Sequence, residues 1–350
     1  MTWTSERLPI VLPPQPGEAL DSWITAYARR LHTTGPELLK HMGINQVLST
    51  LVSQPPTTDL DVIAQRAGVP SELVHSMTLD PHISPARFPF LPSNAWTPTA
   101  PWRPLRDGSR YCPDCLEEHG GRWPLAWRLP WTFSCREHEC LLIDSCPKCQ
   151  GRPRASASRA SDVHRPGRCT RRIHVGRTMP SCGHPLALAA TTALPRDGAV
   201  LEAQQHVTTL LEQLPEHESA PLGSQLHDIY VLGWRSLRAL SVGGPTPDIV
   251  QAVLSECGLG PDGLSLCALP STDKLAVGTT LGTLSTNSQT GAEILTWIVR
   301  ADHGSPRPTS ESVAQHQLAA VRKGARGRGQ RTAPSAQTEL PLRDTAAGQT

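Results

Sequence analysis

The sequence predicts a mainly α-helical protein with small cysteine-rich modules in its middle, and three observations indicate this class. Apolar residues recur at helical spacing on both sides of the middle of the chain. C-x-x-C pairs stand between them, at Cys112–Cys115 and Cys146–Cys149, with the spacing of metal ligands. Residues 301–350 are polar and rich in Gly, Ser, Thr, Arg and Gln, which predicts a disordered tail.

These features divide the chain into four expected parts. We expect N-terminal helical hairpins over residues 1–110, tandem metal-binding modules over 111–190, a C-terminal helical domain over 199–300 and a disordered basic tail over 301–350. The formal net charge of +2 is too small to indicate a partner, but basic residues gather over 152–177 and again over 322–331. No apolar run is long enough to span a membrane.

The start of the chain and one absent motif limit the function classes. Residues 1–12 lack the basic start and the apolar run of a secretory signal, so we expect a cytoplasmic protein whose thiols stay reduced. The phosphate-binding motif G-x-x-x-x-G-K-[ST] is absent. The chain is therefore not expected to hydrolyse a nucleotide.

In the first module, the C-x-x-C pair is followed by a C-x-x-H pair. Each pair points two ligands at one ion, and a tetrahedral Zn²⁺ takes four such ligands. We therefore predict a first zinc site of Cys112, Cys115, Cys135 and His138. The third ligand follows the second cysteine by 20 positions, and Cys169 follows Cys149 by the same number.

The second predicted zinc site comprises Cys146, Cys149, Cys169 and Cys182. The last two cysteines are not a C-x-x-C pair, so His164, His174 and His184 are alternatives for one of them. Disulfides or buried thiols are the alternative for the cysteines as a whole, but reduced thiols at this spacing favour a metal.

Four protein ligands at each site predict a structural role, because a catalytic zinc keeps an open position for water. Glu137, beside His138, is a candidate general base, but the chain has no H-E-x-x-H motif. The remaining thiols, Cys140, Cys257 and Cys267, are expected to be buried or at the surface without a ligand role.

The N-terminal region predicts an extended segment and then helices. Residues 8–16 are apolar and proline-rich, and we expect them to run extended over a partner or over their own domain. A helix is expected to open at Gly17 and to be stopped by Gly35, with Arg29 and Arg30 in its last turn. Its apolar face comprises Leu20, Trp23, Ile24, Tyr27 and Leu31. Thr34 and Glu37 predict a capping box for the next helix.

A second helical pair is expected over residues 59–77, with a turn at Gly68–Pro70 and Ser71 as the cap of its second helix. Its sequence resembles a DNA-binding helix-turn-helix. The alternative is a packing hairpin of the core, because the second helix has no Arg or Lys to reach a phosphate. After residue 199, apolar stripes predict helices over 201–214, 226–240 and 249–259, the last capped by residues 246–248, and a weaker candidate over 292–299.

Two further features have both a structural and a functional interpretation. Tryptophans gather around the metal modules, at Trp96, Trp102, Trp123, Trp127 and Trp131. We expect their rings to cover the C-x-x-C turns, and the alternative is that they stack on unpaired bases. The arginine-rich segment 152–177 is expected to be an exposed loop that either contacts phosphates or is only solvated. Its candidate nucleic-acid contacts are Arg152, Arg154, Arg168, Arg171 and Arg172.

Several motifs follow one another in a characteristic order over residues 8–190. The first motif is P-G-E-A-L-D-S-W (16–23). It is followed by Y-C-P-D-C-L (111–116), W-R-L (127–129), C-R-E-H (135–138), L-L (141–142) and C-P-K-C (146–149), and the last motif is S-C-G-H-P-L (181–186). In combination they resemble the TniQ family. One departure is that the family usually has a cysteine just before the closing C-G, where this chain has Met179–Pro180; Cys169 or a histidine would replace it.

The resemblance implies a transposon target-selection protein that is not an enzyme. In this family the protein recognises target DNA or a DNA-bound targeting complex, in some members a CRISPR effector complex, and recruits a AAA+ ATPase. We expect the ATPase contact in the apolar N-terminal part, at Leu8, Ile10, Leu12, Trp23 and Tyr27. A homodimer is left open. The alternatives are a zinc-finger transcription regulator that binds a promoter alone, and a zinc-dependent hydrolase with an open metal site.

Overall fold

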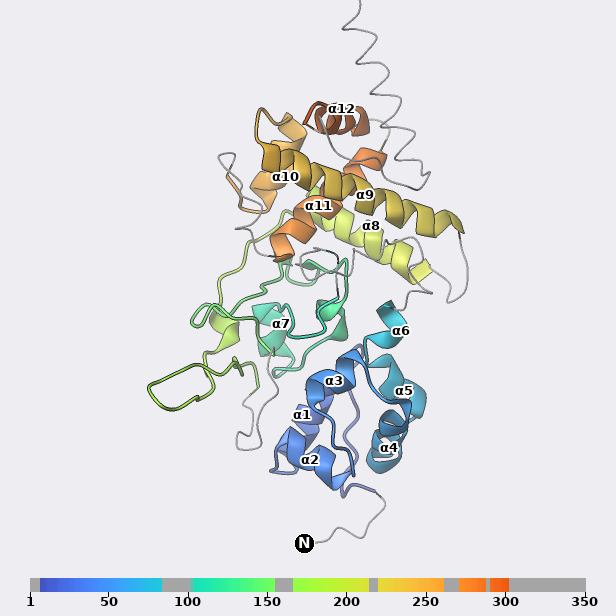
Figure 1. The fold of residues 1–350 in the computed structure, drawn as a ribbon, viewed down its shortest axis with the longest axis vertical. Helices are drawn as coiled ribbons and strands as arrows, with labels where there is room; N and C mark the ends of the chain where they lie inside the picture. Colours follow the sequence, from blue (N-terminus) through green and yellow to red (C-terminus); the bar gives the residue numbers. More distant parts are fainter. Residues whose placement is uncertain are drawn as a thin grey trace, which may run out of the picture.

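The structure is a computed structural model that describes residues 7–83, 102, 104–154, 166–213, 220–260, 271–287 and 290–301. The expectations for Trp96, His164, Cys267, the basic run and the tail beyond residue 301 lie outside these residues. The described part is mainly helical and is arranged along one long axis (Figure 1). N-terminal helices lie at one end, the cysteine-rich region lies in the middle and C-terminal helices lie at the other end.

Six short helices form the N-terminal part. They are α1 (Leu20–Arg30), α2 (Gly35–His41), α3 (Leu48–Ser53), α4 (Thr57–Ala67), α5 (Ser71–Ser76) and α6 (Asp80–Ile83). The capping box of α2 is confirmed, because the Glu37 backbone N–H donates to Thr34 Oγ1 at 3.3 Å and the Thr34 N–H donates to Glu37 Oε2 at 3.1 Å. Gly35 begins α2 and does not end α1. The cap predicted for α5 is wrong, because its N-cap is Pro70 and Ser71 Oγ donates instead to Asp61.

The proline-rich segment 8–16 lies over its own domain. Its side chains alternate, with Leu8, Ile10 and Leu12 packed on the N-terminal core and the residues between them exposed. Trp23 Nε1 donates to the Leu12 carbonyl at 2.8 Å, and the Tyr27 hydroxyl donates to the Ile10 carbonyl. Both rings are fully buried, so these hydrogen bonds attach the proline-rich segment to the N-terminal core.

The middle part has little regular structure. It contains α7 (Pro113–Glu118), two 3-10 turns (Leu125–Arg128 and Leu186–Leu188) and the antiparallel strands β1 (Ser134–Cys135) and β2 (Cys140–Leu141). Trp123 and Trp127 pack among the cysteines, as expected. Trp102 and Trp131 do not; they are buried in the C-terminal core, where Trp102 Nε1 donates to Thr279 Oγ1 at 3.1 Å.

Five helices build the C-terminal part: α8 (Ala199–Gln213), α9 (Ala220–Val242), α10 (Asp248–Glu256), α11 (Ser271–Thr286) and α12 (Gly291–Ala301). The sequence analysis did not predict α11, which lies at the centre and is buried along most of its length. The cap predicted for α10 is also wrong, because its N-cap Pro247 makes no side-chain hydrogen bond. Among the described residues, no helix has both the length and the apolar character needed to cross a membrane.

Buried hydrogen bonds tie the C-terminal helices to the cysteine-rich part. Gln204 of α8 accepts from the backbone N–H groups of Phe133 and Ser134 at 2.9 and 3.2 Å, and its amide donates to the Trp131 carbonyl at 2.9 Å. Asp144 Oδ2 accepts from the backbone N–H and the hydroxyl of Ser271, at 2.9 and 2.6 Å, and so caps the start of α11. These bonds fix the chain on either side of the first cluster of cysteines.

Candidate metal centres

The first predicted ligand set converges on one point. The ligand atoms of Cys112, Cys115, Cys135 and His138 all lie within 4.8 Å of one another. His138 Nδ1 lies 3.5, 3.2 and 3.6 Å from the sulfurs of the three cysteines, in that order. Ligands of a tetrahedral zinc at about 2.3 Å (S) and 2.0 Å (N) are separated by about 3.5 Å, so the spacing fits such an ion.

Two local structures supply these four ligands. Cys112 is the N-cap of α7 and Cys115 lies in its first turn, which Pro113 helps to start. Cys135 and His138 belong to the β1–β2 hairpin, in which Cys135 pairs with Cys140. Glu139 closes the hairpin turn with a φ of 48°.

His138 is oriented by a second contact. Its Nδ1 faces the sulfurs, while its Nε2 lies 3.1 Å from Glu118 Oε2 at the end of α7. A carboxylate on the outer nitrogen fixes the ring and its tautomer and raises the basicity of the nitrogen that binds metal. Glu118 was not predicted from the sequence; it lies one helical turn after Cys115, which places both on the same face of α7.

The second predicted ligand set also converges. The sulfurs of Cys146, Cys149, Cys169 and Cys182 lie within 4.8 Å of one another. Two separations are 3.9 Å (Cys146–Cys182) and 3.7 Å (Cys149–Cys169), close to the value of about 3.8 Å for a tetrahedral S₄ site. Four sulfurs at this spacing can hold one metal ion, so the departure at Met179–Pro180 does not leave this site short of a ligand.

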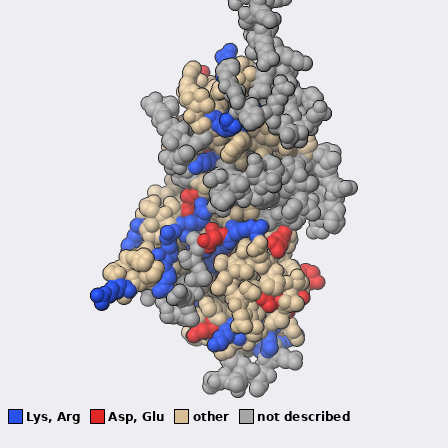
Figure 2. Space-filling view, viewed as in Figure 1, with Lys and Arg blue, Asp and Glu red and all other residues tan. Residues whose placement is uncertain are grey.

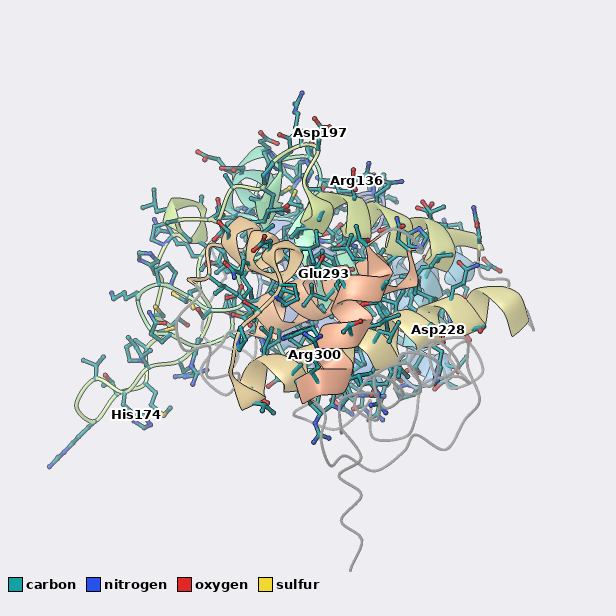
Figure 3. All side chains as sticks on the ribbon, turned by 90° about the horizontal axis from the view of Figure 1, so that it is seen from above. Arg136, His174, Asp197, Asp228, Glu293 and Arg300 are labelled. Carbon is teal, nitrogen blue, oxygen red and sulfur yellow. The ribbon has the colours of Figure 1, made fainter. Side chains whose placement is uncertain are left out.

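A hairpin arm, residues 169–184, brings the last two cysteines together. Its two sides are joined by backbone hydrogen bonds, among them Cys182 N–H to the Arg171 carbonyl at 2.7 Å and Val175 N–H to the Thr178 carbonyl at 3.0 Å. Cys169 and Cys182 face each other at its base. His174 lies near its outer end, away from the cysteines (Figure 3). Cys169 therefore completes the cluster.

One further thiol lies at the first centre. Cys140 Sγ is 3.8 Å from Cys112 Sγ, and the Cys140 side chain is buried. The expectation that Cys140 is a buried thiol agrees with this burial, but its closeness to the centre was not foreseen. Cys257 is buried in the C-terminal core, away from both clusters, and burial raises its pKa to about 12.

The five candidate nucleic-acid arginines separate into two groups. Arg152 donates to Ser271 Oγ at 3.1 Å and lies 3.9 Å from Asp144. Arg154 is paired with Asp21 at 2.6 Å and lies 5.3 Å from the Trp123 ring centre. These two hold the parts of the protein together. The other three, Arg168, Arg171 and Arg172, lie on or beside the hairpin arm and keep exposed surface.

A buried carboxylate joins α1 to the metal-binding part. Asp21 Oδ2 accepts from Arg128 at 2.6 Å as well as from Arg154. Burial by itself raises the pKa of Asp21, but the two guanidinium charges and the hydrogen bond from Arg154 outweigh it and lower the pKa below its ordinary value. Burial lowers the pKa of Arg128. The cluster therefore requires an ionised Asp21.

The comparisons with known proteins cover the first centre and what precedes it. Residues 9–142 match the family model described as TniQ. This range includes residues 9–16 of the proline-rich segment, α1 to α6 and all four ligands of the first cluster, and it ends before Cys146. No curated protein matches the chain.

Proposed function

Because the chain belongs to the TniQ family through residues 9–142, and TniQ proteins are associated with transposition, we propose that it selects target sites for a transposon. In this proposal it is an adaptor and not an enzyme. One surface binds target DNA or a DNA-bound targeting complex, and another recruits a AAA+ regulator of transposition. A zinc-finger transcription regulator is the alternative.

The observation that carries the proposal is the pair of four-ligand clusters. One offers three sulfurs and a nitrogen, and the other offers four sulfurs, a chemistry that suits Zn²⁺. A zinc ion with four protein ligands has no free position for a substrate or water, so both centres would be structural. Their contribution is to stiffen the region that carries the hairpin arm.

The DNA-facing surface in this proposal is the hairpin arm. Figure 2 shows Lys and Arg side chains gathered over the middle of this face and along the projecting arm. Arg168 and Arg171 are exposed and Arg172 is half-buried, while Val175 and Met179 add exposed apolar surface near the tip. A two-stranded ribbon of this kind fits a DNA groove, with arginines on the phosphates.

The ATPase-facing surface in this proposal is the outward side of the proline-rich segment. Trp23, Tyr27 and the inward residues Leu8, Ile10 and Leu12 serve the core, so the partner would meet the residues between them. Pro9 and Val11 lie between the inward residues, Pro13 follows them, and Val11 is 64% exposed. An exposed apolar ridge on a rigid support is suited to a protein partner.

The test is co-sedimentation of a AAA+ transposition ATPase with DNA, with and without this protein. Adaptor function predicts that the protein changes how much ATPase is held on DNA. Val11→Asp should abolish the effect, whereas Leu188→Asp, at another exposed apolar residue, should not. If Val11→Asp leaves recruitment unchanged, this surface is not the ATPase contact. If the wild-type protein does not change the amount of ATPase held on DNA, the transcription regulator is favoured.

A further inference from the structure

A cleft of about 290 Å³ lies between α1 and the metal-binding part. One wall is the last two turns of α1, and the other is the chain that enters the second centre. The turn after α7 forms the floor. Five arginines line this cleft: Arg29, Arg30, Arg122, Arg154 and Arg168. None of its lining residues is acidic, and the His119 imidazole adds a further nitrogen that can donate a hydrogen bond to a ligand.

The positive charge of the cleft is only partly compensated. Arg122 is paired with Glu18 and Arg154 with Asp21, and both carboxylates are buried behind the walls. Arg29, Arg30 and Arg168 have no carboxylate partner among the described residues. Arg168 donates only to the Gly183 carbonyl, at 2.8 Å. Three unpaired guanidinium groups around one cleft repel one another unless an anion lies between them.

The floor is held in place by close backbone packing. Gly121 has a φ of 77°, and a Cβ there would lie 2.4 Å from the backbone nitrogen of Gly167. Only glycine allows the two segments to approach so closely. Arg122 is fixed by both oxygens of Glu18, which also accept from the Ser22 hydroxyl and the Gln15 backbone N–H. The arginines therefore face the cleft from a rigid frame.

We propose that this cleft binds the phosphodiester backbone of a nucleic-acid strand. Guanidinium groups match phosphate oxygens in charge and geometry, and several of them around one cleft are typical of a backbone contact that carries no sequence preference. Arg168 lines the cleft and directly precedes the hairpin arm, so a strand held here continues toward the arm. The inference deepens the proposed function, on which its biological meaning rests.

The test is binding of labelled oligonucleotides to the full-length protein at several salt concentrations. The double variant Arg29→Ala/Arg30→Ala should weaken binding about tenfold or more and reduce the salt slope by about 1.5, since each lost phosphate contact removes about 0.7–0.9. The matched control Arg238→Ala/Arg300→Ala removes two exposed arginines elsewhere and should leave both quantities nearly unchanged. Equal losses in the two double variants would overturn the proposal.

A second variant tests the cleft without removing an arginine. Thr25 lines the cleft, and its hydroxyl donates only to the Asp21 carbonyl within α1. Thr25→Glu places a carboxylate among the arginines and should weaken binding strongly, whereas Thr25→Gln, of the same shape, should bind as wild type. Equal binding by the two variants excludes the cleft as a phosphate site.

The choice of ligand separates the sources of phosphate. Duplex DNA, single-stranded DNA and single-stranded RNA of one sequence show which strand the cleft takes. The strand proposal is wrong if the protein binds none of these oligonucleotides but inorganic phosphate stabilises the wild type and not the Arg29→Ala/Arg30→Ala variant. That result would indicate a small-anion site. Loss of ATPase recruitment with intact oligonucleotide binding contradicts the adaptor function alone.

Discussion

The Asp21 carboxylate accepts a hydrogen bond from the Arg128 guanidinium at 2.6 Å, and the two side chains are only 7% and 1% exposed. This pair connects the first helix of the chain to the segment between the two ligand pairs of the first centre. The motif P-G-E-A-L-D-S-W thus does more than start a helix. Its two acids, Glu18 and Asp21, bind arginines of the metal-binding part.

Asp21→Ala should therefore destabilise the protein by about 3–5 kcal/mol, because it leaves two buried guanidinium groups without their carboxylate. Urea unfolding near neutral pH measures this change. Asp197→Asn, at an exposed acid, serves as the control and should change the free energy of unfolding by less than about 0.5 kcal/mol. A loss for Asp21→Ala as small as that of the control would show that the pair does not hold the two parts together.

Cys115→Ser and Cys169→Ser should each remove one of two bound metal ions, as measured by elemental analysis of the purified protein. Loss of one ligand opens a closed site, and such sites contribute directly to the free energy of folding. Each variant should also become more sensitive to protease, because metal holds a region with little regular structure.

Cys140→Ser is the matched control for these variants. Its sulfur is 3.8 Å from Cys112 but lies outside the four-ligand set, so this variant should retain both ions. A variant that loses an ion here would make Cys140 a ligand in place of His138.

Glu118→Gln should weaken metal binding at the first centre about 10–100-fold while leaving the second unchanged. The amide cannot supply the negative charge that orients and polarises the His138 ring through Nε2. Competition with a coloured chelator measures the two affinities. Glu117→Gln, at the neighbouring exposed acid, is the control, and equal affinities for the two variants would dismiss the role of Glu118.

Asp273 predicts a pH dependence of stability. Burial, and then the nearby Asp144 charge, raise its pKa to about 6. Since the folded state binds this proton more tightly than the unfolded state, the free energy of unfolding should fall as the pH rises from about 4 to about 6. Asp273→Asn should remove this fall and stabilise the protein above pH 6 by up to about 3 kcal/mol. Urea titrations at about pH 4 and about pH 7.5, which bracket this window, measure the difference.

Gly282→Ala should destabilise the C-terminal helices by about 1–3 kcal/mol, although alanine is the better helix former. An added Cβ would lie 2.2 Å from the Ile229 carbonyl oxygen, so α9 and α11 would have to separate. Thermal unfolding gives the change. Gly260→Ala, where a Cβ meets nothing within 4 Å, should not lower the melting temperature.

Local chemistry made much of the structure predictable. The Thr34–Glu37 capping box and both cysteine knuckles depend on residues a few positions apart, so the sequence alone identifies them. The missed helix α11 shows the opposite case. The helix is itself made mostly of Gly, Ala, Thr and Leu and is buried along most of its length, so it has no polar face and no stripe of apolar spacing.

Spacing and periodicity are properties of neighbouring residues, so the sequence was enough to predict the resemblance to the TniQ family, the two cysteine pairs of the metal clusters and most helices. The meeting of Cys169 and Cys182 depends instead on the backbone pairing of the hairpin arm, which only the folded chain shows. The folded structure also determines which arginines pair with a carboxylate. Arg154 and Arg168 look alike in the sequence, but a buried carboxylate from α1, more than a hundred residues away, holds the first and not the second.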